Sequence, residues 1–552
     1  MYNFTPVLQY KVNGRVINNS SSQNNDYSLR ISVTDNEVKV ILSPKKKIEL
    51  ISFKMASKRP MEQDEVFFVN GFQSWSTSYE VHRGEKVRGV TPLSKISKFT
   101  HHLATMFGDY EIFDDYGTEG KFHSNTYTYF RKEKQIELFG SMNEKTGYTF
   151  FAVNNNDDSF DIVKDVEGVY ANEEYELLNV KIIKGTYDEA FDEYFSSMNL
   201  RKPHIDHLSG YTSWYNYFQK IDENIIIRDL NGLDKVKDSV SIFQIDDGFE
   251  SAVGDWLIPD SKKFPKGMKY IADEVHKKGY LVGIWLAPFS AQRNSKVAKE
   301  HPDWLIKDSN GKPEWGCISW GGAYTLDIYN PEVREYIKHF FHVILREWGY
   351  DMVKLDFLYS QSIHPRNGKS RGQIMCEGLE FLRECVGDDK LFLGCGVPLG
   401  ATFGVVDACR ISCDVDLDYS GKIYNTLNIT REVPSAQNAI NNSIFRRHLN
   451  GRVFCNDPDV FFLRSDNLKF TDEQKYLLGK INNLFGDVLF VSDNAGDYGE
   501  KETELVTEFF KENKAKILSA YRKDNDIIEI KYIENNETKQ LVFNLSTGRI
   551  LK

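Results

Sequence analysis

The first 185 residues alternate apolar and polar side chains, which is the period expected of strands with one buried face. The stretches 29–33 and 38–42 each carry Leu, Ile or Val at every second position, with a turn-forming Asp-Asn pair between them. Similar short runs recur at 127–138 and 175–182, separated by Gly, Asn and Asp. These features predict an N-terminal β-sandwich domain over residues 1–185.

A helical period follows at residues 186–209. Thr186 precedes Glu189 by three positions, which is the spacing of a capping box at a helix start. Apolar residues then recur at helical spacing, namely Tyr187, Phe191, Tyr194, Phe195 and Met198. We therefore predict a linker helix whose apolar stripe serves packing.

Short β-rich runs alternate with amphipathic stretches from residue 210 to residue 494, the pattern of parallel βα units. Strands are expected at 211–215, 242–246, 281–286, 352–356, 391–395, 409–414, 453–457 and 488–493. Helices are expected at 267–278, 331–348, 372–386, 439–449 and 472–484. About eight strands with crossovers of this length predict a (β/α)₈ TIM barrel over 210–494.

The last segment returns to the strand period. Apolar residues alternate at 528–532 and again at 541–545, on either side of a polar Asn-Asn turn. We predict a small C-terminal all-β domain at 495–552. The multidomain α/β architecture agrees with a length of 552 residues, which exceeds what one hydrophobic core usually serves.

Composition narrows the choice of partners. A net charge of -11 disfavours a nucleic-acid partner, because such proteins display basic surfaces, and no apolar run approaches the length of a membrane span. The chain starts without a basic segment followed by an apolar one, so a cytoplasmic location is expected. The seven cysteines form no C-x-x-C pair, which disfavours disulfides and a zinc site.

Carboxylates cluster at the predicted strand ends. Asp246 and Asp247 close the second strand, Asp356 the fourth and Asp414 the sixth. Asp457 and Asp459 close the seventh strand and Asp493 the eighth. Each aspartate alone fits a turn or a helix cap, but the carboxyl ends of barrel strands share one rim, so together they predict an acidic active site.

Two reaction classes use such a site. Glycoside hydrolysis needs one ionised carboxylate and one protonated carboxyl. A Mg²⁺ ion among Asp356, Asp414 and Asp457 is the alternative. Lys354 lies two residues before Asp356 on the same strand face, where its ammonium group would oppose a cation, so we expect no metal and no cofactor.

Six strings of residues fall on successive predicted strands: FQIDDG at 243–248, GIWLAPF at 283–289, VKLDFL at 353–358, LGCG at 393–396, RISCD at 410–414 and NDPD at 456–459. In this order and spacing they resemble glycoside hydrolase family 36, the α-galactosidases of the melibiase superfamily. The resemblance spans nearly the whole chain. It implies a retaining exo-α-galactosidase that acts on small oligosaccharides of the melibiose or raffinose type.

The resemblance also implies roles for single residues. Asp356 matches the nucleophile, which forms a galactosyl-enzyme, and Asp414 matches the acid/base of this double displacement. Asp246 and Asp247 match the carboxylates that bind the galactose 4- and 6-hydroxyls. Asp457 and Asp459 resemble supporting residues of the same family.

Further positions match the lining of the sugar pocket. The resemblance implies aromatic walls at Trp214, Tyr215 and Trp285, and polar contacts from Lys354, Cys395 and Arg410. Trp75 lies in the string NGFQSWS at 70–76, which resembles a loop that the family sends over the barrel mouth. Burial of Trp75 between domains, and inert packing of Cys395, are the alternatives.

Other functions stay open. Ser412 and Cys413 replace a Gly-Pro pair of a relative, in a region that shapes the space at sugar carbon 2, so an α-N-acetylgalactosaminidase fits as well. A galactosyl transferase of the raffinose-synthase kind, a catalytically silent carbohydrate-binding protein and a metal-dependent barrel enzyme are further alternatives. The expected partner is a small carbohydrate, with neither nucleic acid nor membrane, and the expected assembly is a monomer or small homo-oligomer.

Overall fold

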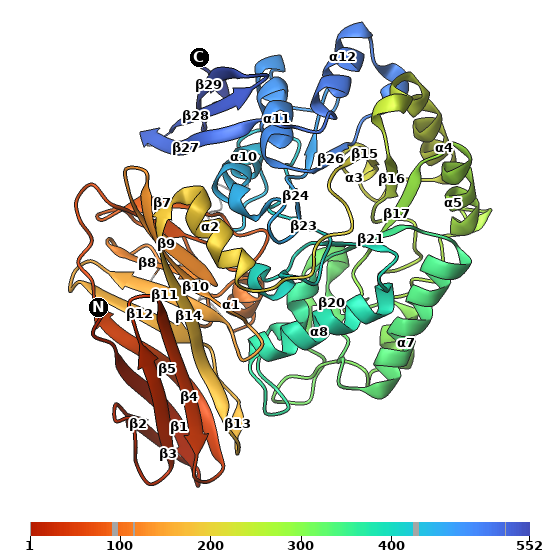
Figure 1. The fold of residues 1–552 in the computed structure, drawn as a ribbon. Coiled ribbons are helices and arrows are strands. Elements are labelled where there is room, and N and C mark those ends of the chain that lie inside the picture. The colour runs from red at the N-terminus through yellow and green to blue at the C-terminus, as the bar shows by residue number, and fades with distance from the viewer. Residues whose placement is uncertain (1, 91–97, 114–115, 423–429, 525) are drawn as a thin grey trace.

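The computed structural model describes residues 2–90, 98–113, 116–422, 430–524 and 526–552. Figure 1 shows the N-terminal strands as one β-rich body beside a larger body in which helices surround a curled sheet. The C-terminal strands lie next to α10 (Ala436–Phe445) and α11 (Asp472–Phe485). The predicted fold class, a mixed α/β chain with β domains at both ends of a barrel, is confirmed.

Two antiparallel sheets form the N-terminal body. One has the order β2-β1-β5-β12-β11-β8, with β13 on β5, and the other the order β3-β4-β14-β10-β9-β6-β7. The strands of the first sheet are β1 (Thr5–Val12), β2 (Arg15–Asn19), β5 (Ile48–Lys58), β8 (Lys121–Asn125), β11 (Thr149–Asn154), β12 (Ser159–Lys164) and β13 (Tyr170–Ala171). Those of the second are β3 (Tyr27–Val33), β4 (Glu37–Pro44), β6 (Val66–Val69), β7 (Tyr79–His82), β9 (Tyr127–Lys132), β10 (Gln135–Ser141) and β14 (Tyr175–Thr186).

The predicted hairpin is confirmed, because β3 and β4 pair with Leu29 opposite Leu42 and Val33 opposite Val38. Along β4 every second side chain is buried, as the alternation requires. The short helix α1 (Lys98–Thr105) interrupts the strands between β7 and β8. The sequence pattern gave no sign of it.

Helix α2 (Tyr187–Ser196) leads out of β14 and toward the barrel. The Thr186 N–H donates to Glu189 Oε2 at 3.1 Å, so the predicted capping box is present. Phe191 and Phe195 are buried on its apolar face, which confirms the packing role of the stripe. The helix ends at Ser196, and the residues up to β15 are connecting chain.

The parallel sheet of the barrel has the order β24-β23-β22-β21-β17-β16-β15-β26-β25. Its strands are β15 (Leu208–Thr212), β16 (Ile242–Ile245), β17 (Leu281–Leu286), β21 (Met352–Leu355), β22 (Leu391–Gly394), β23 (Ala408–Arg410), β24 (Cys455–Asp457), β25 (Val460–Phe461) and β26 (Val488–Val491). The segment 455–461 pairs with β23 through β24 and with β26 through β25. The sheet therefore curls until it closes, and Asp459, with φ at 78°, lies at the break between the two short strands.

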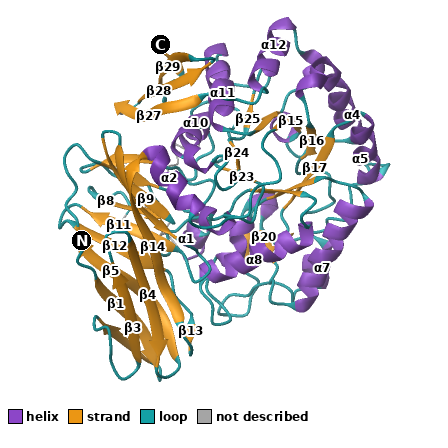
Figure 2. Ribbon diagram, in the orientation of Figure 1, coloured by secondary structure: helices purple, strands orange, loops and turns teal. Residues whose placement is uncertain are grey.

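Helices cover the outside of this sheet, as Figure 2 shows in purple. They include α4 (Glu223–Gly232), α5 (Gly267–Lys277), α7 (Pro331–His342), α8 (Arg371–Val386), α10, α11 and α12 (Glu500–Phe509). All five predicted helices have a counterpart at the expected place. In the described part of the chain, every helix is too short or too polar to cross a membrane.

Two further antiparallel sheets complete the fold. Between β17 and β21 the chain makes a small antiparallel sheet of β18 (Ser290–Gln292), β19 (Trp315–Cys317) and β20 (Ala323–Thr325), which the sequence pattern did not predict. The C-terminal sheet contains β27 (Lys516–Asp524), β28 (Ile527–Glu534), β29 (Glu537–Asn544) and β30 (Arg549–Ile550). Its predicted pair is confirmed by the register of Ile530 opposite Leu541.

Candidate active site

The carboxylates predicted from the sequence stand at the carboxyl ends of the barrel strands, because each follows or ends a strand of the same parallel sheet. Asp246, Asp247 and Asp356 are 3%, 3% and 8% exposed. The Asp414 side chain is 44% exposed. Three carboxylates are thus fixed in the interior, while the fourth reaches solvent at the mouth.

Asp356 is held by donors on both oxygens. Trp285 Nε1 donates to Oδ2 at 3.1 Å, and the backbone N–H of Phe357 donates to Oδ1 at 2.8 Å. Cys395, 1% exposed on the neighbouring strand end, also donates a hydrogen bond to this carboxylate. These contacts fix the carboxylate in one orientation.

Burial raises the pKa of Asp356, and the nearby charge of Asp414 acts in the same direction. The Lys354 charge and the hydrogen bonds from Cys395 and Trp285 oppose that shift, since they favour the ionised form. The carboxylate is thereby more basic than a free aspartate and still surrounded by donors to its charged form.

Asp246 is tied to Lys354, whose Nζ lies 2.8 Å from Oδ2. Gln244 Nε2 donates to the same oxygen at 2.9 Å, and the Asp247 N–H donates to Oδ1 at 2.9 Å. Burial lowers the pKa of Lys354, but the charge of Asp246 outweighs it and raises that pKa. The ammonium group is therefore charged and paired.

Asp247 has different partners. Its Oδ2 accepts hydrogen bonds from Trp320 Nε1 at 2.8 Å and from Gln219 Nε2 at 3.0 Å. Burial raises the pKa of Asp247 first of all, with a further contribution from Asp246. Asp246 and Asp247 thus stand side by side at the end of β16, and Asp247 Oδ1 is buried with no hydrogen-bond partner among the described residues.

Arg410 joins three carboxylates. Its guanidinium lies 3.1 Å from Asp414 Oδ1, 3.4 Å from Asp457 Oδ2 and 2.8 Å from Asp459 Oδ1. Burial raises the pKa of Asp459 to about 7, although the Arg410 charge opposes the shift. Asp457 and Asp459 are each 1% exposed, and their contacts fix the Arg410 guanidinium next to Asp414.

Residues 215–372, which include β16, β17 and β21, match the Melibiase family. We call residues 215–372 the Melibiase segment. Over 138 residues, 24% of this chain, it is 35% identical to α-galactosidase Mel36A of Lactobacillus acidophilus. Over 139 residues, 23% of this chain, it is 30% identical to α-galactosidase 1 of Pediococcus pentosaceus. Each alignment covers 18% of the relative, so the matched stretch spans under a fifth of these curated proteins.

The fold likeness extends further than the sequence likeness. The structure is similar to TtGalA, an α-galactosidase from Thermus thermophilus solved in complex with p-nitrophenyl α-D-galactopyranoside. The TM-score is 0.72 at 22% identity, and the match covers 93% of this chain and 98% of that one. At this identity the likeness shows a shared fold.

Two aromatic residues of the Melibiase segment, Trp285 and Tyr215, are buried in different surroundings. Trp285, 2% exposed, packs edge to face on Trp320 with ring centroids 5.8 Å apart, and so lies between Asp356 and the Trp320 loop. Tyr215 is also 2% exposed, and its hydroxyl donates to Asp459 Oδ2. The predicted wall position of Tyr215 is thus a buried hydrogen-bond donor in the structure.

Trp214, beside Tyr215, is half-buried and packs edge to face on Phe218 at 5.1 Å. It belongs to the short helix α3 (Trp214–Tyr217) that follows β15. Contact of either Trp214 or Tyr215 with a sugar stays a prediction.

Trp75 approaches the surroundings of Asp356 from outside the Melibiase segment. Its ring packs edge to face on Phe357 at 5.2 Å and on Tyr359 at 5.7 Å. Trp75 and Asp356 both lie close to Gly396, because a Cβ at this glycine would be 2.8 Å from Trp75 Cζ2 and 3.0 Å from Asp356 Oδ1. The loop from the N-terminal body thus places Trp75 near Asp356, and its role in covering a sugar stays a prediction.

The Trp75 loop is fixed by an arginine of helix α10's C-terminal end. Arg446 is fully buried and donates to the carbonyl oxygens of Ser74 at 2.6 Å and Ile411 at 2.7 Å. Its Nε donates to Ser78 Oγ at 2.9 Å. One side chain thus joins the Trp75 loop to the segment that leads to Asp414.

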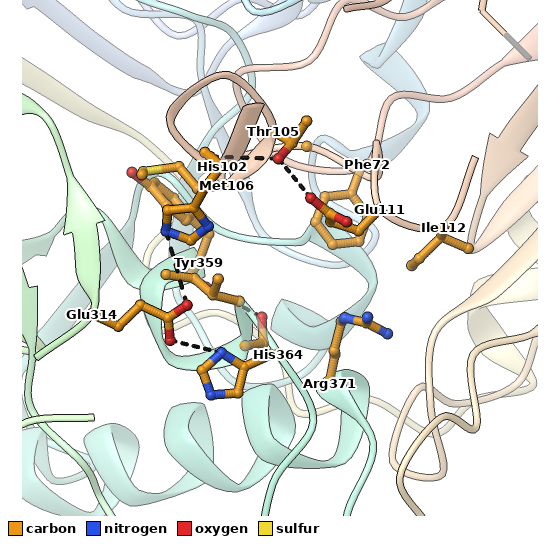
Figure 3. Close-up of a pocket in the computed structure, with 13 residues that line it drawn as sticks. Phe72, His102, Thr105, Met106, Glu111, Ile112, Glu314, Tyr359, His364 and Arg371 are labelled. Carbon is orange, nitrogen blue, oxygen red and sulfur yellow. Dashed lines mark hydrogen bonds and ion pairs between the residues drawn. The ribbon is translucent and has the colours of Figure 1, made fainter. Parts of the chain in front are cut away.

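A cavity of about 240 Å³ adjoins this region, and Figure 3 shows it with Tyr359 and Phe72 in its lining. Glu314 is central in its polar lining, with Oε2 2.8 Å from His364 Nδ1 and Oε1 4.0 Å from His102 Nε2. The four carboxylates of the active site are not part of the lining. Tyr359 is the residue shared between this cavity and the surroundings of Trp75.

Three residues near Asp247 were not found from the sequence: Gln219 and Trp320, which donate to it, and Glu250, whose carboxyl lies within hydrogen-bonding reach of it. Trp320 comes from the excursion between β17 and β21 and has φ at 58°, which is rare for a bulky side chain. The long interval between the two predicted strands was the signal available, since it exceeds one crossover helix. Gln219 and Glu250 carried no pattern of their own.

Proposed function

We propose that this protein is a retaining exo-α-galactosidase. The observation that carries the proposal is the set of carboxylates at one barrel rim: a buried, donor-bound Asp356, a half-exposed Asp414, and the pair Asp246 and Asp247. Similarity of the Melibiase segment to proteins named α-galactosidases supports it.

The proposed chemistry is a double displacement. Asp356 attacks the anomeric carbon while Asp414 protonates the departing glycosidic oxygen, which gives a galactosyl-enzyme. Asp414 then removes a proton from water, and that water displaces Asp356, so the α configuration is retained. The environments fit these roles, because Asp356 is oriented by fixed donors and Asp414 is exposed enough to exchange protons with solvent.

The proposed specificity rests on Asp246 and Asp247. Their oxygens would accept hydrogen bonds from the 4- and 6-hydroxyls of a terminal galactose. A glucoside directs its 4-hydroxyl elsewhere and would leave a buried carboxylate oxygen without its partner. The substrates we propose are small oligosaccharides of the melibiose and raffinose type, taken up into the cytoplasm and hydrolysed by a monomer or small homo-oligomer.

The first test is nitrophenol release from the α-galactoside, the α-N-acetylgalactosaminide and the α-glucoside, with EDTA present. We expect activity on the α-galactoside and a loss of about 10³-fold or more in kcat for Asp356→Ala. Asp351→Asn, at the opposite end of the same strand, is the matched control. Full activity of Asp356→Ala would contradict the assignment, and activity only on the acetylated sugar would change the substrate.

The second test separates the two carboxylates. Asp414→Ala should lose more activity on melibiose than on nitrophenyl galactoside, because nitrophenolate departs without a proton. Added azide should yield the α-galactosyl azide with Asp414→Ala, and the β-azide with Asp356→Ala, as read by proton NMR. Asp416→Asn on the same loop is the control, and identical azide products from both variants would contradict double displacement.

A further inference from the structure

Glu250 lies on the loop after β16, three residues beyond Asp247, and is 7% exposed. Its carboxyl lies within hydrogen-bonding reach of the Asp247 carboxyl, and its Oε2 accepts the Gly248 N–H at 3.3 Å. Glu250 also forms an isolated β-bridge with Pro259, and the adjacent Ser251 N–H donates to the Ile258 carbonyl at 2.8 Å. The backbone therefore holds this side chain in place.

Asp247 has one oxygen for which an ionised Glu250 supplies no donor. Its Oδ2 is bound by Trp320 and Gln219, whereas its Oδ1 is buried and has no N–H or O–H partner among the described residues when Glu250 is ionised. A protonated Glu250 is such a partner. Two buried carboxyl groups in contact favour one shared proton over two charges.

No cation neutralises the pair within the described residues. Lys354 forms an ion pair with Asp246 instead, with Nζ 2.8 Å from Oδ2. Lys263 approaches from the following loop, but its Nζ donates to the carbonyl oxygens of Gln219 at 2.7 Å and Gly248 at 2.9 Å. The described cations near Asp247 and Glu250 are thus engaged elsewhere. A proton on the pair itself is what removes one of the two negative charges.

Resting on the proposed function, we infer that Glu250 is a positioning residue that holds Asp247 toward the sugar through a shared proton, so that galactose affinity falls at alkaline pH. Burial raises the pKa of Glu250 well above its usual range, and the charge of Asp247 raises it further. At neutral pH Glu250 carries the proton and Asp247 the charge that binds hydroxyls. Loss of the proton places two negative charges side by side and moves Asp247 from its position.

The test is galactose binding by calorimetry between pH 5.5 and 9 in the Asp414→Asn background, which removes titration of the acid/base. The dissociation constant of this parent should rise about tenfold or more toward the alkaline end. Glu250→Gln keeps an N–H donor without a titrating proton, so its dissociation constant should stay within about twofold over the range. Glu250→Ala should weaken binding at pH 6 by about 5- to 100-fold, because Asp247 then lacks its donor.

Glu223→Gln, another buried glutamate of the Melibiase segment, is the matched control and should follow the parent. Equal pH dependence of parent and Glu250→Gln would overturn the inference, as would weak binding of Glu250→Gln at pH 6. Should Glu250→Ala fail to fold, Glu250→Gln alone decides. A folded parent that binds no galactose at any pH would overturn the proposed function itself, which is a distinguishable result.

Discussion

At the scale of single residues, burial and hydrogen bonding have opposite effects on the pKa of Asp356 in the candidate active site. Burial raises the pKa of Asp356, and Trp285, Cys395 and Lys354 work against it. The indole N–H of Trp285 is the donor whose removal changes the side chain least, because Phe fills much of the same space. This contact can therefore be tested by itself.

We expect Trp285→Phe to lower kcat about 10-fold and to move the acid limb of the kcat/KM profile to higher pH. The reason for the shift is that a hydrogen bond to the charged form lowers the pKa of Asp356, so its loss raises that pKa. The profile is measured with nitrophenyl α-galactoside. Trp256→Phe is the control, since Trp256 packs on Trp285 and its Nε1 has no hydrogen-bond partner among the described residues. An equal shift in both variants would contradict the explanation.

At the scale of elements, the site depends on segments that are far apart in the chain and close in space. The loop with Trp75 meets the end of β22 at Gly396, where φ is 55°. The absence of a side chain at this glycine lets Trp75 and Asp356 both approach its backbone closely. The position of Trp75 is therefore fixed by β22 as well as by Arg446.

Gly396→Ala should lower kcat/KM for α-galactosides by about 100-fold, because the new Cβ would displace Trp75 or Asp356. Gly451→Ala is a matched control, since Gly451 has a similar φ of 71° and no heavy atom within 4 Å of an added Cβ. Both variants carry the same kind of backbone strain. If they lose activity equally, the close approach at Gly396 is not the cause.

The elements also differ in whether a sequence pattern could predict them. Period-two alternation located β3 and β4, and the capping box located α2, because both signals arise within a few neighbouring residues. The sheet β18–β20 gave no such signal, and its Trp320 is therefore the main site residue that periodicity could not find. Its function depends on contact with Asp247, which is distant in the chain.

At the scale of the whole molecule, one residue takes part both in the closure of the barrel and in the surroundings of Asp414. Asp459 lies at the break between β24 and β25, accepts a hydrogen bond from the Val415 N–H at 2.8 Å and pairs with Arg410. Its pKa rises from 3.8 to about 7 on folding, because burial disfavours its charge. Folding therefore favours the protonated form of Asp459. Ionisation of this residue lowers the free energy of unfolding.

Between pH 3.8 and about 7 the folded state retains a proton on Asp459 that the unfolded state loses, so this residue's contribution to stability falls as pH rises through that window. We expect the Tm of Asp459→Asn minus that of the wild type to increase from pH 4 to 7 and to level off above. Scanning calorimetry measures the difference. Asp388→Asn, at a side chain 89% exposed, should give a flat line, and a flat line for Asp459→Asn would contradict the argument.

The sequence by itself determined the class of fold, the strand ends on which the aspartates lie, and the family resemblance, since periodicity and short strings are properties of neighbouring residues. Only the tertiary structure decided that Arg410 gathers Asp414, Asp457 and Asp459 and that Trp75 meets Asp356. It also decided that Glu250 stands against Asp247. These arrangements depend on how separate segments pack in three dimensions, and burial there sets the charges that the proposed chemistry uses.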